Sequence, residues 1–159
     1  PMRAISGQIR AAREGRDQFA LTQTTQLMAG AIGEDDRTIM TLSKALYTTY
    51  GLKRVYYTAF GYTHEAQGYP ELPLTRTPIW RVARLYQADR LMALYGFSPD
   101  DVTPEGAAML ERDIDPKAAW ALRHLHLYPV EVNTADYEML LRVPGIGLTY
   151  ARRILEASL

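Results

Sequence analysis

Two glycines near the C-terminus have the spacing of a main-chain site for phosphate. Gly145 and Gly147 lie in the run Val143-Pro144-Gly145-Ile146-Gly147, between two apolar segments of helical spacing, so the chain must turn tightly there. Without Cβ atoms, the two glycines let an oxygen approach several N–H groups, and the following helix adds the positive end of its dipole. Arg152 and Arg153 follow. This pattern predicts contact with a phosphate backbone and offers nothing that reads bases.

Two short helices must hold this turn. Asn133 or Thr134 is the predicted N-cap of the first helix, and Pro144 is predicted to end it. The residues expected to face inward from the two helices are Tyr137, Leu140, Leu141, Leu148, Ala151, Ile154 and Leu155. Residues 132–159 therefore resemble a helix-hairpin-helix motif, with the hairpin and both helices included.

The resemblance to this motif implies a set of contacts with DNA. The amides of Gly145, Gly147 and Thr149 would hold a phosphate. If Gly147 also needs a positive φ, any other residue at this position would pay a conformational cost of about 1 to 2 kcal/mol. The carbonyls of Leu141, Val143 and Ile146 would hold a monovalent cation that bridges to the phosphate. The full predicted DNA-binding set is Val143, Pro144, Gly145, Ile146, Gly147, Thr149, Arg152 and Arg153. In the alternative interpretation the hairpin is only a structural turn, and the chain is a protein–protein docking module.

A second resemblance rests on five phrases that run in order along nearly the whole chain. They are Gln26-Leu27-Met28-Ala29-Gly30-Ala31, Tyr50-Gly51-Leu52-Lys53-Arg54-Val55-Tyr56-Tyr57, Pro73-Leu74-Thr75-Arg76, Arg84-Leu85-Tyr86-Gln87-Ala88-Asp89-Arg90-Leu91 and Asp115-Pro116-Lys117-Ala118-Ala119-Trp120-Ala121-Leu122-Arg123-His124. They look like the C-terminal part of the DNA modification/repair radical SAM protein family. In that family a β/α barrel binds a [4Fe-4S] cluster through a Cys-x3-Cys-x2-Cys loop and cleaves S-adenosylmethionine. The resemblance implies that the parent uses both cofactors and that the partners of this chain are DNA and a missing N-terminal barrel segment.

Composition limits what the chain does by itself. Its 159 residues contain no cysteine, so it offers no thiolate for a cluster, and we expect this chain alone to hold no cofactor and not to cleave S-adenosylmethionine. No residue is singled out as catalytic. The net charge is zero, so a DNA-binding surface must be local. The chain has no long apolar run and no signal peptide, which predicts a cytoplasmic protein without a membrane partner. It begins inside a helical pattern, which predicts that its N-terminus lies within a longer protein.

The predicted elements change character along the chain. Before residue 61, helices over 2–17 and 36–50 alternate with strands near 25–30 and 54–60, so we expect parallel strands. The predicted fold is an α/β remnant, the last strands and helices of a partial βα barrel, followed by an all-α helical module with a C-terminal helix-hairpin-helix. The predicted divisions are 1–61 for the partial barrel, 62–77 for a crossing loop, 78–131 for connecting helices and 132–159 for the helix-hairpin-helix.

Three Pro-containing pairs predict helix starts, namely Thr77-Pro78, Thr103-Pro104 and Asp115-Pro116. The helix over 78–95 carries apolar residues around nearly its whole circumference, which predicts a buried helix between the β/α part and the C-terminal helices. On this helix, Arg81 and Arg84 are within reach of an anion, although an ion pair between the two parts of the chain is the simpler interpretation.

Overall fold

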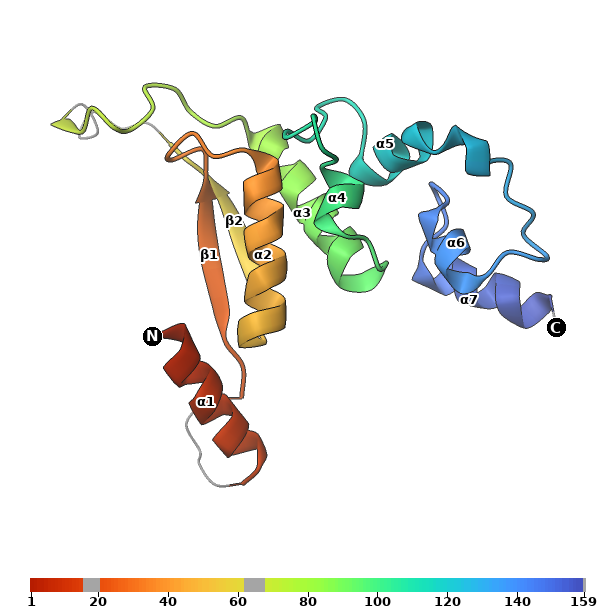
Figure 1. The fold of residues 1–159 in the computed structure, drawn as a ribbon, viewed down its shortest axis with the longest axis horizontal. Helices are drawn as coiled ribbons and strands as arrows, with labels where there is room; N and C mark the ends of the chain where they lie inside the picture. Colours follow the sequence, from red (N-terminus) through yellow and green to blue (C-terminus); the bar gives the residue numbers. More distant parts are fainter. Residues whose placement is uncertain (16–20, 62–67, 159) are drawn as a thin grey trace.

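The computed structural model describes residues 1–15, 21–61 and 68–158. The fold is mixed α/β, with a small parallel sheet near the N-terminus and helices after it (Figure 1). The elements in order are α1 (Met2–Arg13), β1 (Thr24–Ala29), α2 (Asp36–Tyr50), β2 (Arg54–Ala59), α3 (Ile79–Leu94), α4 (Pro99–Val102), α5 (Pro116–Arg123), the 3-10 helix η2 (Leu125–Leu127), α6 (Tyr137–Arg142) and α7 (Leu148–Ala157).

The predicted strand–helix–strand unit with parallel strands is confirmed. β1 pairs with β2 in a register that runs from Thr24 opposite Arg54 to Ala29 opposite Ala59, and α2 connects the two strands. Side chains alternate across a strand, so Tyr57 is buried toward the helices while its neighbour Tyr56 is exposed on the opposite face. Within the described residues the sheet has two strands. The part of the first predicted helix over 16–17 lies outside the described residues.

Tyrosine hydroxyls cover the outer edge of β2. The amide of Val55 donates to Tyr47 Oη at 3.0 Å, and the amide of Tyr57 donates to Tyr86 Oη at 3.0 Å. These bonds satisfy donors that an edge strand would otherwise present to another chain. The edge of the sheet that remains for a further strand is therefore that of β1.

The ends of α2 follow from local sequence. Asp35 is its N-cap and accepts a hydrogen bond from the Thr38 amide at 2.7 Å. Gly51 ends it in the left-handed region, with φ of +62°. Both ends agree with the predicted helix over 36–50.

Two of the three predicted helix starts are confirmed, because α5 begins at Pro116 and α3 begins at Ile79, but only α5 has the predicted cap. Asp115 caps α5 by accepting from the amides of Lys117 and Ala118. Thr77 does not cap α3, because its hydroxyl donates to the Ala29 carbonyl at 2.8 Å and so ties the loop before α3 to the end of β1. The prediction of a helix start at Thr103 is wrong, because Thr103 ends α4. The N-cap of α4 is instead Ser98, which forms a capping box with Asp101.

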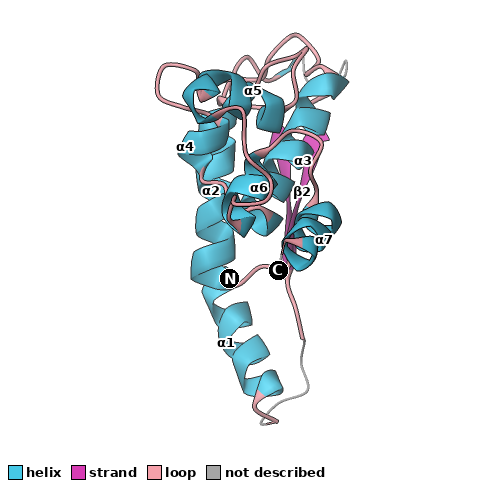
Figure 2. Ribbon diagram, turned by 90° about the vertical axis from the view of Figure 1, so that its right-hand side faces the viewer, coloured by secondary structure: helices cyan, strands magenta, loops and turns pink. Residues whose placement is uncertain are grey.

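α3 lies between the sheet and the C-terminal helices, as predicted (Figure 1), and it packs on β2, α2 and α5. Figure 2 shows the molecule from the side of α6 and α7. Leu85 and Ala88 in its middle are fully buried, but Ile79 at its start is 83% exposed and Leu94 at its end is 44% exposed. The prediction of a helix buried on all sides is therefore wrong, because both ends are exposed and one side of the central turns, at Ala83, Gln87 and Arg90, is exposed as well.

Arg81 and Arg84 of α3, the two arginines predicted to be within reach of an anion, have different roles. Arg81 is buried and forms an ion pair with the buried Asp36 of α2, with Nε and Oδ1 2.6 Å apart. Arg84 donates to the carbonyl oxygens of Glu111 and Arg112. The ion-pair interpretation is confirmed for Arg81, and both guanidinium groups are engaged within the chain.

Candidate nucleic-acid interface

α6 and α7 are joined by a type II β-turn. The Ile146 amide donates to the Val143 carbonyl at 3.1 Å, which closes the turn. Pro144 occupies its second position and Gly145 its third, where φ is +86°. Proline sets the first of these dihedrals and glycine permits the second, so the residue types account for the turn.

The cap of α6 corrects the sequence prediction. Asp136 is the N-cap, and its Oδ1 accepts from the Met139 amide at 2.7 Å. Asn133 and Thr134 lie before the helix, where their amides donate to Glu131. An Asp three residues later competes as a cap, and the apolar spacing alone did not distinguish the candidates.

The inward faces of α6 and α7 are as predicted. Leu140, Leu141 and Ala151 are buried in one cluster. The partly buried residues packed around them are Tyr95, Ala135, Tyr137, Ile146, Leu148, Ile154 and Leu155. This cluster fixes how α7 leaves the turn.

Gly147 is the N-cap of α7 and has φ of −99° and ψ of 177°. This is extended backbone, so the positive φ of the turn is at Gly145 and the conformational cost considered for Gly147 does not apply. A Cβ built on Gly147 would meet Tyr95 Oη at 3.6 Å, an ordinary contact. Neither backbone conformation nor crowding in the described chain requires glycine here. Glycine instead leaves the amides in the first turn of α7 without a side-chain cap, whereas α5 and α6 both have an Asp cap.

The predicted contact residues form one end of the α6–α7 unit. The turn residues Pro144 and Gly145 are exposed, while Val143, Ile146 and Gly147 are partly buried. Thr149, Arg152 and Arg153 are exposed on α7. Thr149 and Arg153 are four residues apart and lie on the face opposite the buried Ala151. The structure therefore places the uncapped amides next to the exposed face that carries the arginines.

Two of the three carbonyls predicted to bind a cation, those of Val143 and Ile146, have partners of their own. The Val143 carbonyl accepts the hydrogen bond of the turn, and the Ile146 carbonyl accepts one from Nζ of Lys117 on α5. Lys117 Nζ also lies 5.0 Å from the centroid of the Tyr95 ring. An ammonium group thus occupies part of the predicted cation position. No local sequence pattern identifies Lys117 as a site residue, because 29 residues separate it from the carbonyl it binds.

Lys117 should make stability depend on pH in the alkaline range. Burial lowers the pKa of its ammonium from 10.5 to about 8. Between these two values the unfolded chain retains a proton that the folded chain has lost, so the stability of the folded state should rise with pH. Urea unfolding of the native chain and of Lys117→Met across this window tests the prediction. The difference in unfolding free energy between the two proteins should change with pH, and parallel curves would contradict it.

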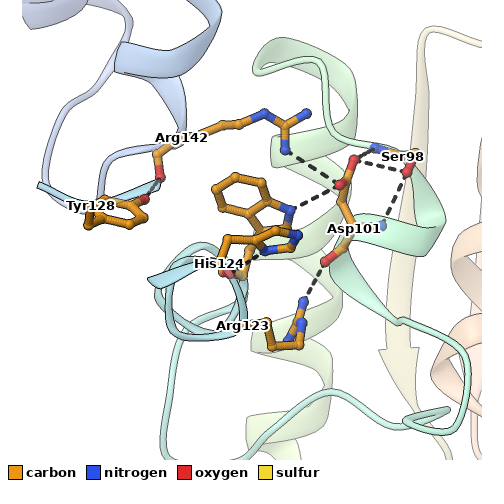
Figure 3. A network of polar contacts seen from close by, with 7 residues as sticks. Ser98, Asp101, Arg123, His124, Tyr128 and Arg142 are labelled. Atoms are coloured by element: carbon orange, nitrogen blue, oxygen red, sulfur yellow. Dashed lines mark hydrogen bonds and ion pairs between the residues drawn. The ribbon is translucent and has the colours of Figure 1, made fainter. Parts of the chain in front are cut away.

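A second cation joins α6 to α4 and α5. The Arg142 guanidinium lies 4.5 Å from the Trp120 ring centroid and 4.6 Å from that of Phe97. Its Nη1 is 3.4 Å from Asp101 Oδ1 (Figure 3). Tyr128 Oη also donates to the Arg142 carbonyl at 3.2 Å. Arg142 is therefore committed to holding the α6–α7 unit in place and is not a free group for DNA.

Asp101 is the acceptor at the centre of this network (Figure 3). It accepts from the Ser98 amide at 2.8 Å and from Trp120 Nε1 at 3.0 Å. Burial acts to raise the pKa of Asp101, but hydrogen bonds from Ser98 and Trp120 and the charge of Arg142 together lower it. The carboxylate is thus held ionised opposite Arg142.

Family models, curated proteins and solved structures contain no match to this chain. In the described part of the chain, no group of three or more His, Cys, Asp and Glu side chains is arranged to hold a metal ion. None of the described helices combines the length and apolar character needed to cross a membrane.

Proposed function

We propose that this chain binds the backbone of DNA, without sequence specificity, through a helix-hairpin-helix formed by α6, the glycine turn and α7. The observation that carries the proposal is the uncapped N-terminus of α7 beside an exposed glycine turn. The amides of Gly147 and Thr149 lie where the positive end of the helix dipole is strongest. An anion that approaches Gly147 would meet no Cβ.

The charges near the turn support the same assignment. Arg152 and Arg153 are exposed, and neither forms an ion pair with another described residue. The ammonium of Lys117 adds a positive charge behind the Ile146 carbonyl. Two or three phosphate contacts predict a dissociation constant of roughly 10⁻⁴ to 10⁻⁶ M and a log–log salt slope of about −2 to −3. Scrambling the DNA sequence should change this little, because contacts to phosphate carry no base information.

We further propose that β1, α2 and β2 are the closing part of the βα barrel of a radical SAM protein of DNA modification or repair. The parallel pairing of the strands and the uncovered edge of β1 support this, because a preceding barrel strand would pair there. The residues of this chain do not fit an iron–sulfur cluster, because they include no cysteine. The cluster and S-adenosylmethionine would therefore be bound by a segment outside this sequence.

Gly147→Val tests the DNA-binding proposal directly. The backbone at Gly147 is extended, so valine adopts it without strain, and the main expected cost is about 1 kcal/mol for a poorer N-cap. The branched side chain would stand where a phosphate oxygen must approach. We expect DNA affinity to fall about tenfold or more while the circular dichroism spectrum is retained. Fluorescence anisotropy with a labelled duplex measures the loss.

Arg153→Ala is the complementary variant, with Arg76→Ala as its matched control. Arg153 is exposed on α7, so its loss should lower affinity modestly and reduce the salt slope by about 1, with folding unchanged. Arg76 is an exposed arginine in the loop before α3, and its loss should leave binding unchanged. If folded Gly147→Val binds DNA as the native chain does, the hairpin is a structural turn and the protein–protein docking function replaces this proposal.

A further inference from the structure

A cavity of about 690 Å³ opens between α2, the start of β2 and the second half of α3. None of the turn residues proposed to contact DNA lines it. Its size is typical of sites for small organic ligands. The partly buried rings of Tyr47 and Tyr86 contribute to its wall, together with Leu52 and Met92. The cavity therefore offers apolar and aromatic surface to a ligand.

Four positively charged side chains from different parts of the sequence line this cavity. Lys44 comes from α2, Lys53 from the residue just before β2, Arg54 from the start of β2, and Arg90 from α3. All four are exposed, and none makes an ion pair with any other described residue. The Arg54 guanidinium has a ring contact instead, 5.6 Å from the centroid of Tyr56. Because the chain as a whole has zero net charge, this excess of positive charge is a local feature.

The acidic residue in the cavity wall, Asp89, is engaged by the protein core. Asp89 is 7% exposed, and it accepts hydrogen bonds from Tyr47 Oη at 2.9 Å and Tyr57 Oη at 3.0 Å. Burial raises the pKa of Asp89, while these hydrogen bonds and the charge of Arg54 act to lower it. The hydroxyl of Tyr57 is itself held within 2.8 Å of Ser43 Oγ. This carboxyl is thus engaged by the protein core.

We infer that this cavity binds the phosphate group of a nucleotide, either free or within a DNA strand. Four cations line the cavity and form no ion pair with any other described residue, so they match the charge and the acceptor oxygens of a phosphate. The apolar and tyrosine surface beside them suits the sugar and base of the same ligand. This site is separate from the turn and rests on different residues, so it goes beyond the proposed function.

The experiment isolates the cavity by using Gly147→Val as the background, because that change removes the contact at the turn. The probes are dAMP, inorganic phosphate, a single-stranded oligonucleotide and polyglutamate, with binding followed by calorimetry and by amide chemical shifts. The double variant Arg54→Gln/Arg90→Gln removes two exposed charges from the cavity, and Arg76→Gln removes one elsewhere. Urea unfolding establishes that each variant is folded.

We expect dAMP to bind saturably and inorganic phosphate to displace it. The double variant should weaken dAMP binding about tenfold or more, whereas Arg76→Gln should leave it unchanged. Binding of the oligonucleotide but not of dAMP, with the same dependence on the double variant, supports the site and identifies a strand as the source of the phosphate. The inference is overturned if neither probe binds, if the double variant binds as its background does, or if polyglutamate binds as tightly. Each comparison is made within one background, so it remains interpretable even if Gly147→Val proves to have no effect on duplex binding.

Discussion

Asp36→Ala is expected to lower the free energy of unfolding by about 3 to 5 kcal/mol, because it leaves the guanidinium of Arg81 buried without its carboxylate. Asp36 is fully buried, and its Oδ1 lies 2.6 Å from Arg81 Nε. Its Oδ2 accepts the Leu110 amide at 2.8 Å, so the substitution also removes the acceptor of a buried backbone donor. One side chain thus connects α2 to α3 and to the segment before α5. Urea unfolding monitored by tryptophan fluorescence measures the loss.

Two further variants separate the buried charge from the contact itself. Asp100→Ala removes the partner of Arg37 in an exposed ion pair and should cost about 0 to 1 kcal/mol. Asp36→Ala combined with Arg81→Met should recover much of the stability, because no unpaired charge remains in the core. If the double variant were less stable than Asp36→Ala alone, the uncompensated guanidinium would not be the cause.

Gly30→Ala is the second change expected to have a large effect. Gly30 follows β1 with φ of +84°, which costs an alanine about 1 to 2 kcal/mol. A Cβ there would also stand 2.0 Å from Thr77 Oγ1, whose hydroxyl is bonded to the Ala29 carbonyl. Displacing Thr77 should add about 1 to 3 kcal/mol to the loss.

Gly33→Ala is the matched control for Gly30→Ala. Gly33 has φ of +76° with no atom within 4 Å of a built Cβ, so it has the backbone cost without the collision. The difference in unfolding free energy between the two variants measures the close approach of Thr77 to the chain. Equal losses would show that the contact between Thr77 and the end of β1 contributes nothing.

Signals that lie close together in the sequence were sufficient to predict the bounds of α2 and the buried residues between α6 and α7. A cap and a left-handed stop lie at the two ends of α2, and the helical spacing of Leu140, Leu141 and Ala151 identifies the inner faces of α6 and α7. The same kind of signal failed at Thr77. A Thr-Pro pair is equally consistent with capping α3 and with holding β1, and the position of the Ala29 carbonyl decides between them.

For the turn between α6 and α7, the sequence pattern predicted only part of the backbone conformation. The residue types predicted a tight turn that leaves amides free, but they did not tell which glycine has the positive φ. The hydrogen bond from Ile146 to Val143 places Gly145 third in the turn and leaves Gly147 extended. This difference matters, because it makes Gly147 a site that can be substituted to test ligand binding without strain in the backbone.

Local sequence signals were sufficient to predict α2, the parallel strand–helix–strand unit and the inner faces of α6 and α7, and the composition shows that the chain offers no thiolate. These depend on residues within a few positions of one another, where caps, periodicity and composition act. The tertiary structure alone decided that Lys117 binds the Ile146 carbonyl, that Arg142 is committed to Asp101 and the aromatic rings, and that four cations meet at one cavity. A charged side chain is paired, buried or free according to which distant elements pack beside it, and no local pattern contains that information.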